Sequence, residues 1–176
     1  MDTQNKIEFI TFYEPVHIQL SKFCRAISGN SEDGEDLLQD TILNSLEGFN
    51  KIKDKKVFKS YMFSVASNLQ KMRLRRLKFK AKFNDTEINQ IVDFGQNQEY
   101  LTDFKIVYEK MLSLPERMAE ALILYHISDL SLEEIQKIQG GSLSGVKLRL
   151  KRGREKLLSL LNTKEQLKVA LMLITF

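Results

Sequence analysis

The stretch LPERMAEALILYHISDLSLEEIQKIQGGSLSGVKLRLKRGREKL, residues 114–157, indicates the fold of the last third of the chain. Its opening Leu-Pro-Glu is typical of a helix start. Proline fits the first helical turn, where its missing N–H is not needed, and Glu116 complements the positive end of the helix. We expect this helix to run from Pro115 to about Ile127. The pair Gly140-Gly141 interrupts the later part of the stretch, so it reads as helices separated by turns.

Two further helices are predicted in the same stretch. Ser131 and Glu134 have the spacing of a capping box, which predicts a helix that buries Ile135 and Ile138. After the glycines, Ser142 starts a third helix with an aliphatic stripe at helical spacing. The stripe consists of Leu143, Val146, Leu150 and Leu157, and the cations that point elsewhere are Lys147, Arg149, Lys151, Arg152, Arg154 and Lys156. Such a helix can pack on its predecessors and enter the DNA major groove, so we predict a helix-turn-helix.

Composition favours a helical protein that has no internal disulfide and no secretory signal. The 176 residues include only 8 Gly and 2 Pro, too little turn chemistry for an all-β fold. Cys24 is the one cysteine, which excludes an internal disulfide and fits a reducing compartment. The N-terminus does not resemble a secretory signal, and the apolar run 169–174 is far shorter than the roughly 20 residues of a membrane span. We therefore expect a cytoplasmic protein without direct membrane insertion.

The charges are segregated along the chain, although the net charge is only +4. Residues 31–47 hold six acids and no Lys or Arg, whereas residues 71–82 hold seven bases and no acid. Segregation of this kind predicts one surface for a basic protein partner and another for phosphate.

The apolar periodicity predicts two small helical domains. Helices are expected over 7–27, from Ser31 to about Phe49, and over 57–77, the last burying Phe58, Tyr61, Met62, Val65, Leu69 and Met72 and exposing Ser60 and Ser67. We therefore predict an all-α fold with a domain at 1–80, a flexible acidic linker at 81–104, a helix-turn-helix domain at 105–163 and an apolar tail at 164–176.

Several of these segments together resemble the extracytoplasmic-function sigma factors of the sigma-70 superfamily. They are the acidic helix GEDLLQDTILNSL (34–46), a polar basic loop, the helix FKSYMFSVASNLQKMRLRR (58–76), the acidic linker and the stretch 114–157. The resemblance covers about residues 9–160 and rests on the order and spacing of five segments. It implies a subunit that binds bacterial RNA polymerase core and directs it to promoter DNA, with an anti-sigma factor as a possible regulator.

In that family the acidic helix docks on the clamp helices of the polymerase through a D-L-x-Q-[DE] stretch, matched here by residues 36–40. The resemblance therefore implies a core-binding face. Its residues are Asp36, Gln39, Asp40 and Leu43, which also share a side of the helix apart from the core stripe.

The family's minus-ten region, which holds the unwound strand, corresponds to the loop 50–56 and the helix 59–76. Asn68 falls on the asparagine of the family's I-A-R-N pattern. The sequence departs from the family at Tyr61, where tryptophan is usual, and at Ser64 and Ser67, where arginines are common. Binding of the minus-ten element is expected to use Lys55, Lys56, Lys59, Asn68, Lys71, Arg75 and Arg76.

The family's V-G-T-V-K-S-R-L-S-R-A-R pattern corresponds to residues 143–154, with Gly141 in place of a usual aliphatic. By the resemblance, minus-thirty-five bases are approached by Ser144, Gly145, Lys147, Leu148 and Lys151, and phosphates by Arg149, Arg152 and Arg154. Gly145 and Gly153 lie inside the helix, and each should cost about 0.5 to 1 kcal/mol relative to alanine, so a loose helix is expected.

No catalytic or metal-binding pattern is visible. His17 and His126 are isolated, no Cys/His cluster suggests zinc, and no phosphate-binding or dinucleotide motif occurs. We expect no enzyme activity, cofactor or small-molecule substrate. Two other interpretations stay open: a helix-turn-helix regulator that never docks on polymerase, and a degenerate sigma-like module that binds only a protein regulator.

Overall fold

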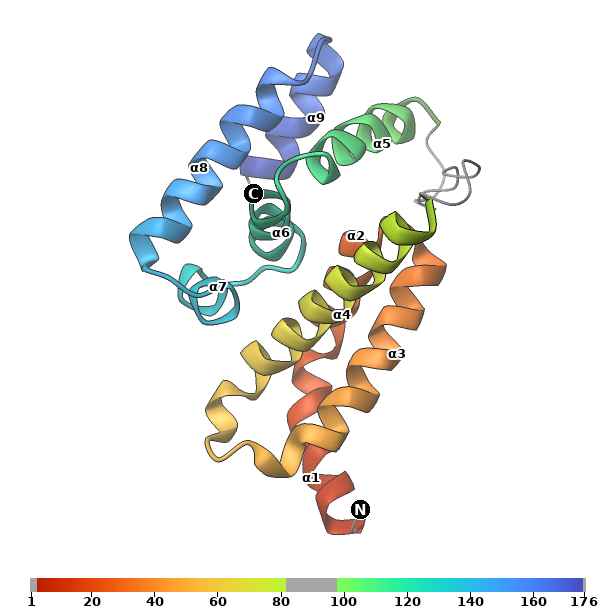
Figure 1. Ribbon diagram of the computed structural model, residues 1–176. Coiled ribbons are helices and arrows are strands. Elements are labelled where there is room, and N and C mark those ends of the chain that lie inside the picture. The colour runs from red at the N-terminus through yellow and green to blue at the C-terminus, as the bar shows by residue number, and fades with distance from the viewer. Residues whose placement is uncertain (1–2, 82–97, 176) are drawn as a thin grey trace. The chain divides into compact units, whose positions relative to one another are not determined.

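The computed structural model describes residues 3–81 and 98–175, with side chains for residues 4–76, 105–164 and 166–171 (Figure 1). Every regular element in these ranges is a helix, which confirms the all-α fold. The chain divides into two compact units, residues 1–90 and 91–176. None of the helices in the described ranges is both long and apolar enough to cross a membrane.

The first unit begins with two helices where the sequence predicted one. Helix α1 (Thr3–Tyr13) is followed by a 3-10 turn, η1 (Glu14–Val16), and then by α2 (His17–Ser28). Pro15 explains the difference, because proline lacks the N–H that would bond to the preceding turn and its ring clashes with that turn's carbonyl. The break lets Phe9 and Leu20, from different helices, both reach the core.

Helices α2 and α3 (Ser31–Gly48) are joined by a very short turn. Gly29 has a φ of 86° at the end of α2, and the side chain of Asn30 accepts a hydrogen bond from the backbone N–H of Asp33 at 2.7 Å. A Cβ on Gly34 would lie 2.5 Å from Arg25 Cα. Glycine at position 34 therefore permits the close approach of α2 and α3.

Helix α4 (Phe58–Ala81) packs against α2 and α3, after the 3-10 turns η2 (Phe49–Lys51) and η3 (Lys55–Val57). The predicted buried stripe on α4 was partly wrong. Met72 is 45% exposed, whereas Ser60 and Ser67 are buried. The buried Gln70 donates from Nε2 to the carbonyl of Ile27 at 3.1 Å. At Gln70, α4 meets the end of α2, where a hydrogen bond rather than hydrophobicity accounts for the buried residue.

The second unit contains α5 (Gln98–Leu112), α6 (Glu116–Leu122), the π-helical segment η4 (Ile123–Ile127), α7 (Leu132–Gln139), α8 (Leu143–Ser159) and α9 (Lys164–Thr175). Residues 98–104, which the sequence assigned to the linker, are thus helical. The remainder of that predicted linker lies almost entirely at 82–97, outside the described residues.

The helix-turn-helix of α7 and α8 has the local features predicted for it. Ser131 accepts from the N–H of Glu134 at 3.2 Å, and Glu134 Oε2 accepts from the N–H of Ser131 at 2.8 Å, which completes the capping box. Gly140 and Gly141 both have positive φ, 72° and 90°, a conformation that favours glycine. The sequence alone therefore places this turn correctly.

The apolar tail forms α9 and packs on α5 and α8. Val169 and Ala170 are buried, and Leu171 is about half exposed. The tail is consequently part of the core of the second unit.

Candidate nucleic-acid and protein interfaces

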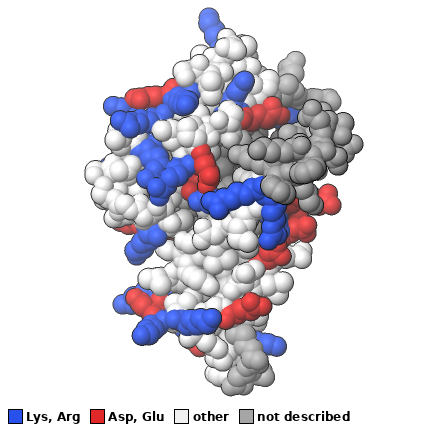
Figure 2. All heavy atoms as spheres, in the orientation of Figure 1, with Lys and Arg blue, Asp and Glu red and all other residues white. Residues whose placement is uncertain are grey.

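Helix α8 has a buried side and an exposed basic side. Val146, Leu150 and Leu157 are buried, as predicted. Figure 2 shows Lys and Arg atoms gathered over α8. Most residues expected to approach bases or phosphates lie on this exposed side: Ser144, Lys147, Leu148, Lys151 and Arg152, with Gly145 half-buried.

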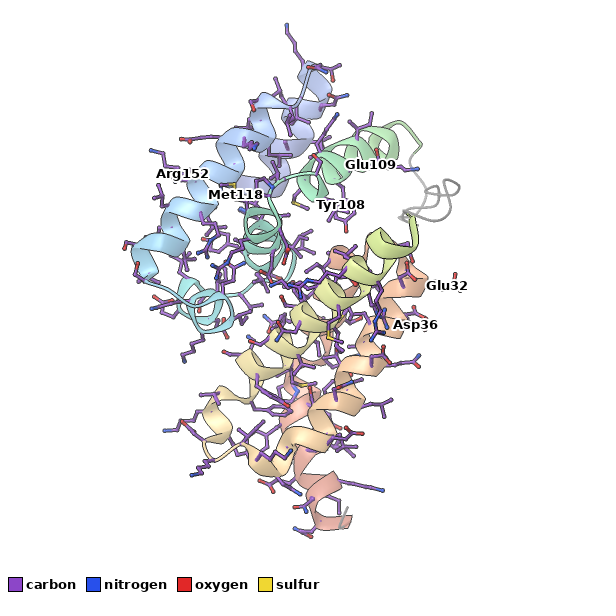
Figure 3. The ribbon with its side chains drawn as sticks, viewed as in Figure 1. Glu32, Asp36, Tyr108, Glu109, Met118 and Arg152 are labelled. Carbon is purple, nitrogen blue, oxygen red and sulfur yellow. The ribbon has the colours of Figure 1, made fainter. Side chains whose placement is uncertain are left out.

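Gly153 has a packing role that the sequence did not reveal. It is buried, and a Cβ at this position would lie 3.4 Å from Leu122 Cδ1 and 3.6 Å from Met118 Cβ. Met118 lies between α6 and α8, whereas Arg152 projects from the outer side of α8 (Figure 3). The glycine thus lets the backbones of α6 and α8 approach closely, a packing role that stands beside its expected cost in helix propensity.

Arg154 is one of two predicted phosphate contacts that have partners within the second unit. Its guanidinium lies 5.5 Å from the Tyr125 ring centroid and reaches His126 Nε2 at 3.2 Å from Nε and 3.1 Å from Nη2. Burial, followed by the charge of Arg154, lowers the pKa of His126 to about 4. The imidazole is therefore neutral at pH 7, and its Nε2 accepts from Arg154.

Arg149 is the other. Arg149 is half-buried and donates from Nη1 to Oε1 of Gln139, which is the last residue of α7. Gln139 Nε2 donates to Glu120 Oε2 at 2.8 Å and to the carbonyl of Arg117 at 3.2 Å, and Arg117 Nη2 donates to the Gln139 carbonyl. We call these four residues, Arg117, Glu120, Gln139 and Arg149, the Gln139 cluster. It connects α6, α7 and α8, and sequence reasoning missed it.

The predicted core-binding face on α3 is exposed in the first unit. Asp36, Gln39 and Leu43 are exposed, and the Leu43 side chain is 59% accessible although it is apolar. Glu32 and Asp36 project from the side of α3 away from α4 (Figure 3). Leu43 adds one apolar side chain to an otherwise polar and exposed face.

Asp40 differs from the rest of this face. Its Oδ2 accepts a hydrogen bond from Arg73 Nη2 on α4 at 2.5 Å, and Arg73 Nη1 donates to the Asp33 carbonyl at 3.2 Å. Arg73 was missed from the sequence, since 33 residues separate it from Asp40. The acidic face therefore includes one carboxylate that also connects two helices.

The turn before α4 contains two of the predicted minus-ten cations, in different environments. Lys55 Nζ donates to the carbonyl of Phe49 at 2.9 Å and lies 3.3 Å from the centroid of the Phe49 ring. Lys56 is exposed, and its backbone N–H bonds to Asp54 Oδ1 at 2.9 Å. Lys55 thus stabilises the turn, whereas Lys56 presents its charge to solvent.

On α4, the remaining predicted minus-ten residues follow one another along the helix. Asn68, Arg75 and Arg76 are exposed, while Lys59 and Lys71 are half-buried and engaged in other contacts. Of the two serines at positions where arginines are common in the family, Ser67 is 3% exposed, whereas Ser64 is half-buried and its Oγ donates to the Ser60 carbonyl at 2.8 Å. The structure thus places position 67 away from solvent and position 64 at the partly buried edge of the helix.

The described residues contain no group of three or more His, Cys, Asp or Glu side chains that could hold a metal ion. Cys24 is buried, and burial raises the pKa of its thiol to about 12, so it is unreactive. The exposed charged surfaces described above, on α3, on α4 with its preceding turn and on α8, are therefore the candidate interfaces.

Comparison with known proteins identifies the family. Residues 12–79 match the model of sigma-70 region 2, and residues 104–157 match that of sigma-70 region 4. The RNA polymerase sigma factor SigV of Bacillus subtilis (strain 168) is 31% identical over 139 residues, 78% of this chain and 81% of SigV. The ECF RNA polymerase sigma factor EcfG of Rhodopseudomonas palustris (strain TIE-1) is 27% identical over 142 residues, 81% of this chain and 78% of EcfG.

A solved structure agrees in fold. The sigma factor RpoE from Bartonella quintana, in complex with the anti-sigma factor NepR, superposes with a TM-score of 0.70 at 24% identity, covering 88% of this chain and 99% of RpoE. Region 2 falls on the unit with the acidic face of α3, and region 4 on the unit with the basic face of α8. The chain belongs to the extracytoplasmic-function sigma factors of the sigma-70 family.

Proposed function

We propose that this RNA polymerase sigma factor docks on core polymerase through Asp36, Gln39, Asp40 and Leu43 of α3, and reads the minus-thirty-five element with α8. The observation that carries the proposal is the exposure of an acidic face with an apolar leucine on α3, on a side of the helix apart from the buried Leu37 and Leu38, although Asp40 of this face also bonds to Arg73 of α4. A regulator that only binds DNA has no need of such a face. Catalysis of RNA synthesis belongs to the polymerase, and the site of action is the cytoplasm.

We select the DNA-contacting residues by the exposure of their side chains to solvent. Lys147, Leu148 and Lys151, with Ser144 and Gly145 at the start of α8, are placed for bases, and Arg152 for a phosphate. In region 2, Lys56, Asn68, Arg75 and Arg76 are the exposed groups suited to the minus-ten strand, with Lys59 and Lys71 beside them. Lys55 and Arg154 contribute mainly through the turn and the helix that they stabilise.

A protein regulator is the second partner of the proposal. The similar RpoE is bound to an anti-sigma factor in its solved structure, and the exposed apolar side chains here, among them Ile18 and Leu43, offer surface to such a partner. A module that bound only the regulator would be the alternative function, favoured by the serines at positions 64 and 67, of which Ser67 is buried.

Purified chain added to core polymerase and a promoter library tests the proposal. We expect co-elution with core polymerase and initiation from a subset of promoters that share a minus-thirty-five sequence. A chain that binds DNA but never core polymerase would be an ordinary regulator. A chain that binds neither would support the degenerate module.

A further inference from the structure

The turn between α7 and α8 does not by itself explain how α8 is oriented. A Cβ placed on Gly140 or Gly141 would meet no atom within 4 Å, so neither position is a glycine because of a close approach, and the side-chain bond to this pair that joins it to α7 is from Gln136 Nε2 to the Gly141 carbonyl at 3.0 Å. Both residues also have positive φ, which glycine adopts without strain in many turns. Contacts outside these two glycines therefore also contribute to the angle between α7 and α8, including the packing of α8 on α6 and α7.

The Gln139 cluster provides such contacts immediately before the turn. Gln139 is 8% exposed and Glu120 is 3% exposed, so their polar groups are largely removed from water. A buried carboxylate without hydrogen-bond donors is costly, and Gln139 Nε2 supplies one at 2.8 Å. The amide of Gln139 satisfies Glu120 on α6 with its nitrogen and Arg149 on α8 with its oxygen.

This arrangement directs Arg149 toward α6 and α7. The flanking Lys147, Leu148 and Lys151 are exposed, whereas Arg149 is half-buried and bonded to Gln139. Among the cations between Lys147 and Lys151, where the proposed base-reading residues lie, Arg149 is therefore the one that bonds within the protein.

We propose that Gln139 is a positioning residue for recognition of the minus-thirty-five element, and that Arg149 acts through Gln139 rather than on a phosphate. This inference rests on the proposed function. Hydrogen bonds to base edges are short and directional, so a small tilt of α8 weakens them. Contacts from long cationic side chains to phosphates tolerate the same tilt, because they depend mainly on charge. Loss of Gln139 should therefore reduce discrimination between sequences more than affinity for DNA as such.

The test uses the full chain with core polymerase and compares a preferred promoter with one whose minus-thirty-five element is scrambled. In Gln139→Met and in Arg149→Met, the ratio of the two affinities should fall about fivefold or more, the size of one lost base contact. The double variant should lose no more than either single variant, because the two residues act as a unit. The salt dependence of binding should stay as in the unaltered chain.

Arg152→Met is the matched control, since Arg152 is exposed three residues from Arg149. It should lower affinity for both promoters equally and reduce the salt slope by about one phosphate contact. If Arg149→Met behaves like this control, or if a folded Gln139→Met keeps the full affinity ratio, the positioning role is refuted.

An exchange variant guards against misfolding. Gln139→Glu places two carboxylates together and should lose both stability and discrimination, whereas Glu120→Gln/Gln139→Glu again pairs an amide with a carboxylate that accepts from Arg149. The exchange should restore most of the affinity ratio as well as the melting temperature. Restored melting without restored discrimination would overturn the inference. An unaltered chain that binds no core polymerase and prefers no promoter would instead overturn the proposed function.

Discussion

Asp40 of α3 and Arg73 of α4 are joined by a 2.5 Å hydrogen bond between Oδ2 and Nη2. The acids of the α3 face therefore differ, because Asp40 has a partner on another helix. Asp36, one turn earlier on the same face, is exposed. A charge change at Asp36 therefore tests docking alone, whereas a change at Asp40 also acts on the packing of α3 and α4.

Asp36→Lys should leave the fold intact and weaken core binding. Surface substitutions usually change the free energy of unfolding by no more than about 0.5 kcal/mol. A lysine facing a basic polymerase surface slows association, and we expect the affinity for core polymerase to fall at least about tenfold. Competition against another sigma factor measures the loss. Glu14→Lys, an equal charge change at an exposed position of the same unit, should compete normally. Equal competition by both variants would contradict the docking face.

Asp40→Lys should lower stability as well as docking. It replaces a partly exposed ion pair with two neighbouring cations, a change worth about 1 kcal/mol in the free energy of unfolding. The exchanged pair Asp40→Arg/Arg73→Asp should recover the melting temperature without recovering core binding, because the acid has moved to α4. Urea denaturation and the competition assay separate the two effects. Normal core binding by the exchanged pair would show that Asp40 is not used in docking.

Substitutions on α8 should divide into base-reading and phosphate contacts. Alanine at Lys147 or Lys151 should relax preference at one or two minus-thirty-five positions, at about 1 to 3 kcal/mol each. The ion pair of Lys151 with Glu155, 3.9 Å apart and exposed, is too weak to oppose this use. Arg152→Ala should weaken all sequences alike. Binding to matched and scrambled DNA over a salt series distinguishes them, and equal losses in every case would rule out base reading.

Gly153 should tolerate alanine but not a larger residue. A Cβ there would lie 3.4 Å from Leu122, an ordinary contact, so Gly153→Ala should be neutral or raise the free energy of unfolding by up to about 1 kcal/mol through helix propensity. Gly153→Leu should overpack the α6–α8 contact and cost about 1 to 3 kcal/mol. Thermal denaturation measures both. A stable Gly153→Leu would mean that α6 and α8 can separate freely.

His126 should make the second unit less stable in mild acid. Its pKa is lowered to about 4 in the folded chain from an ordinary value of 6.5, so the unfolded chain binds the proton first as the pH falls. Stability should therefore be complete above pH 6.5 and decline toward pH 4, by about 1 kcal/mol after allowance for the partly exposed ring. His126→Gln keeps an acceptor for Arg154 and should lack this part of the decline. Identical pH profiles for the two proteins would contradict the assignment.

Features that depend on residues close together in the chain could be predicted from the sequence. The capping box of Ser131 and Glu134 and the two glycines after Gln139 involve residues close together in the chain, so their geometry can be read without the fold. The exposed face of α3 was likewise predicted, because helical periodicity separates Asp36 and Leu43 from the buried Leu37.

Features that depend on distant residues were decided only by the tertiary structure. Arg73 meets Asp40 across 33 positions, and Gln139 meets Glu120 across 19. Ser67 is buried on α4 although its type favours the surface. Gly153 reads from the sequence as a weak point, yet in the structure it permits the contact of α8 with Leu122 on α6. Helical spacing tells which residues share a side of one helix, but the partner opposite that side is set by how separate helices pack, and a local pattern contains no information about it.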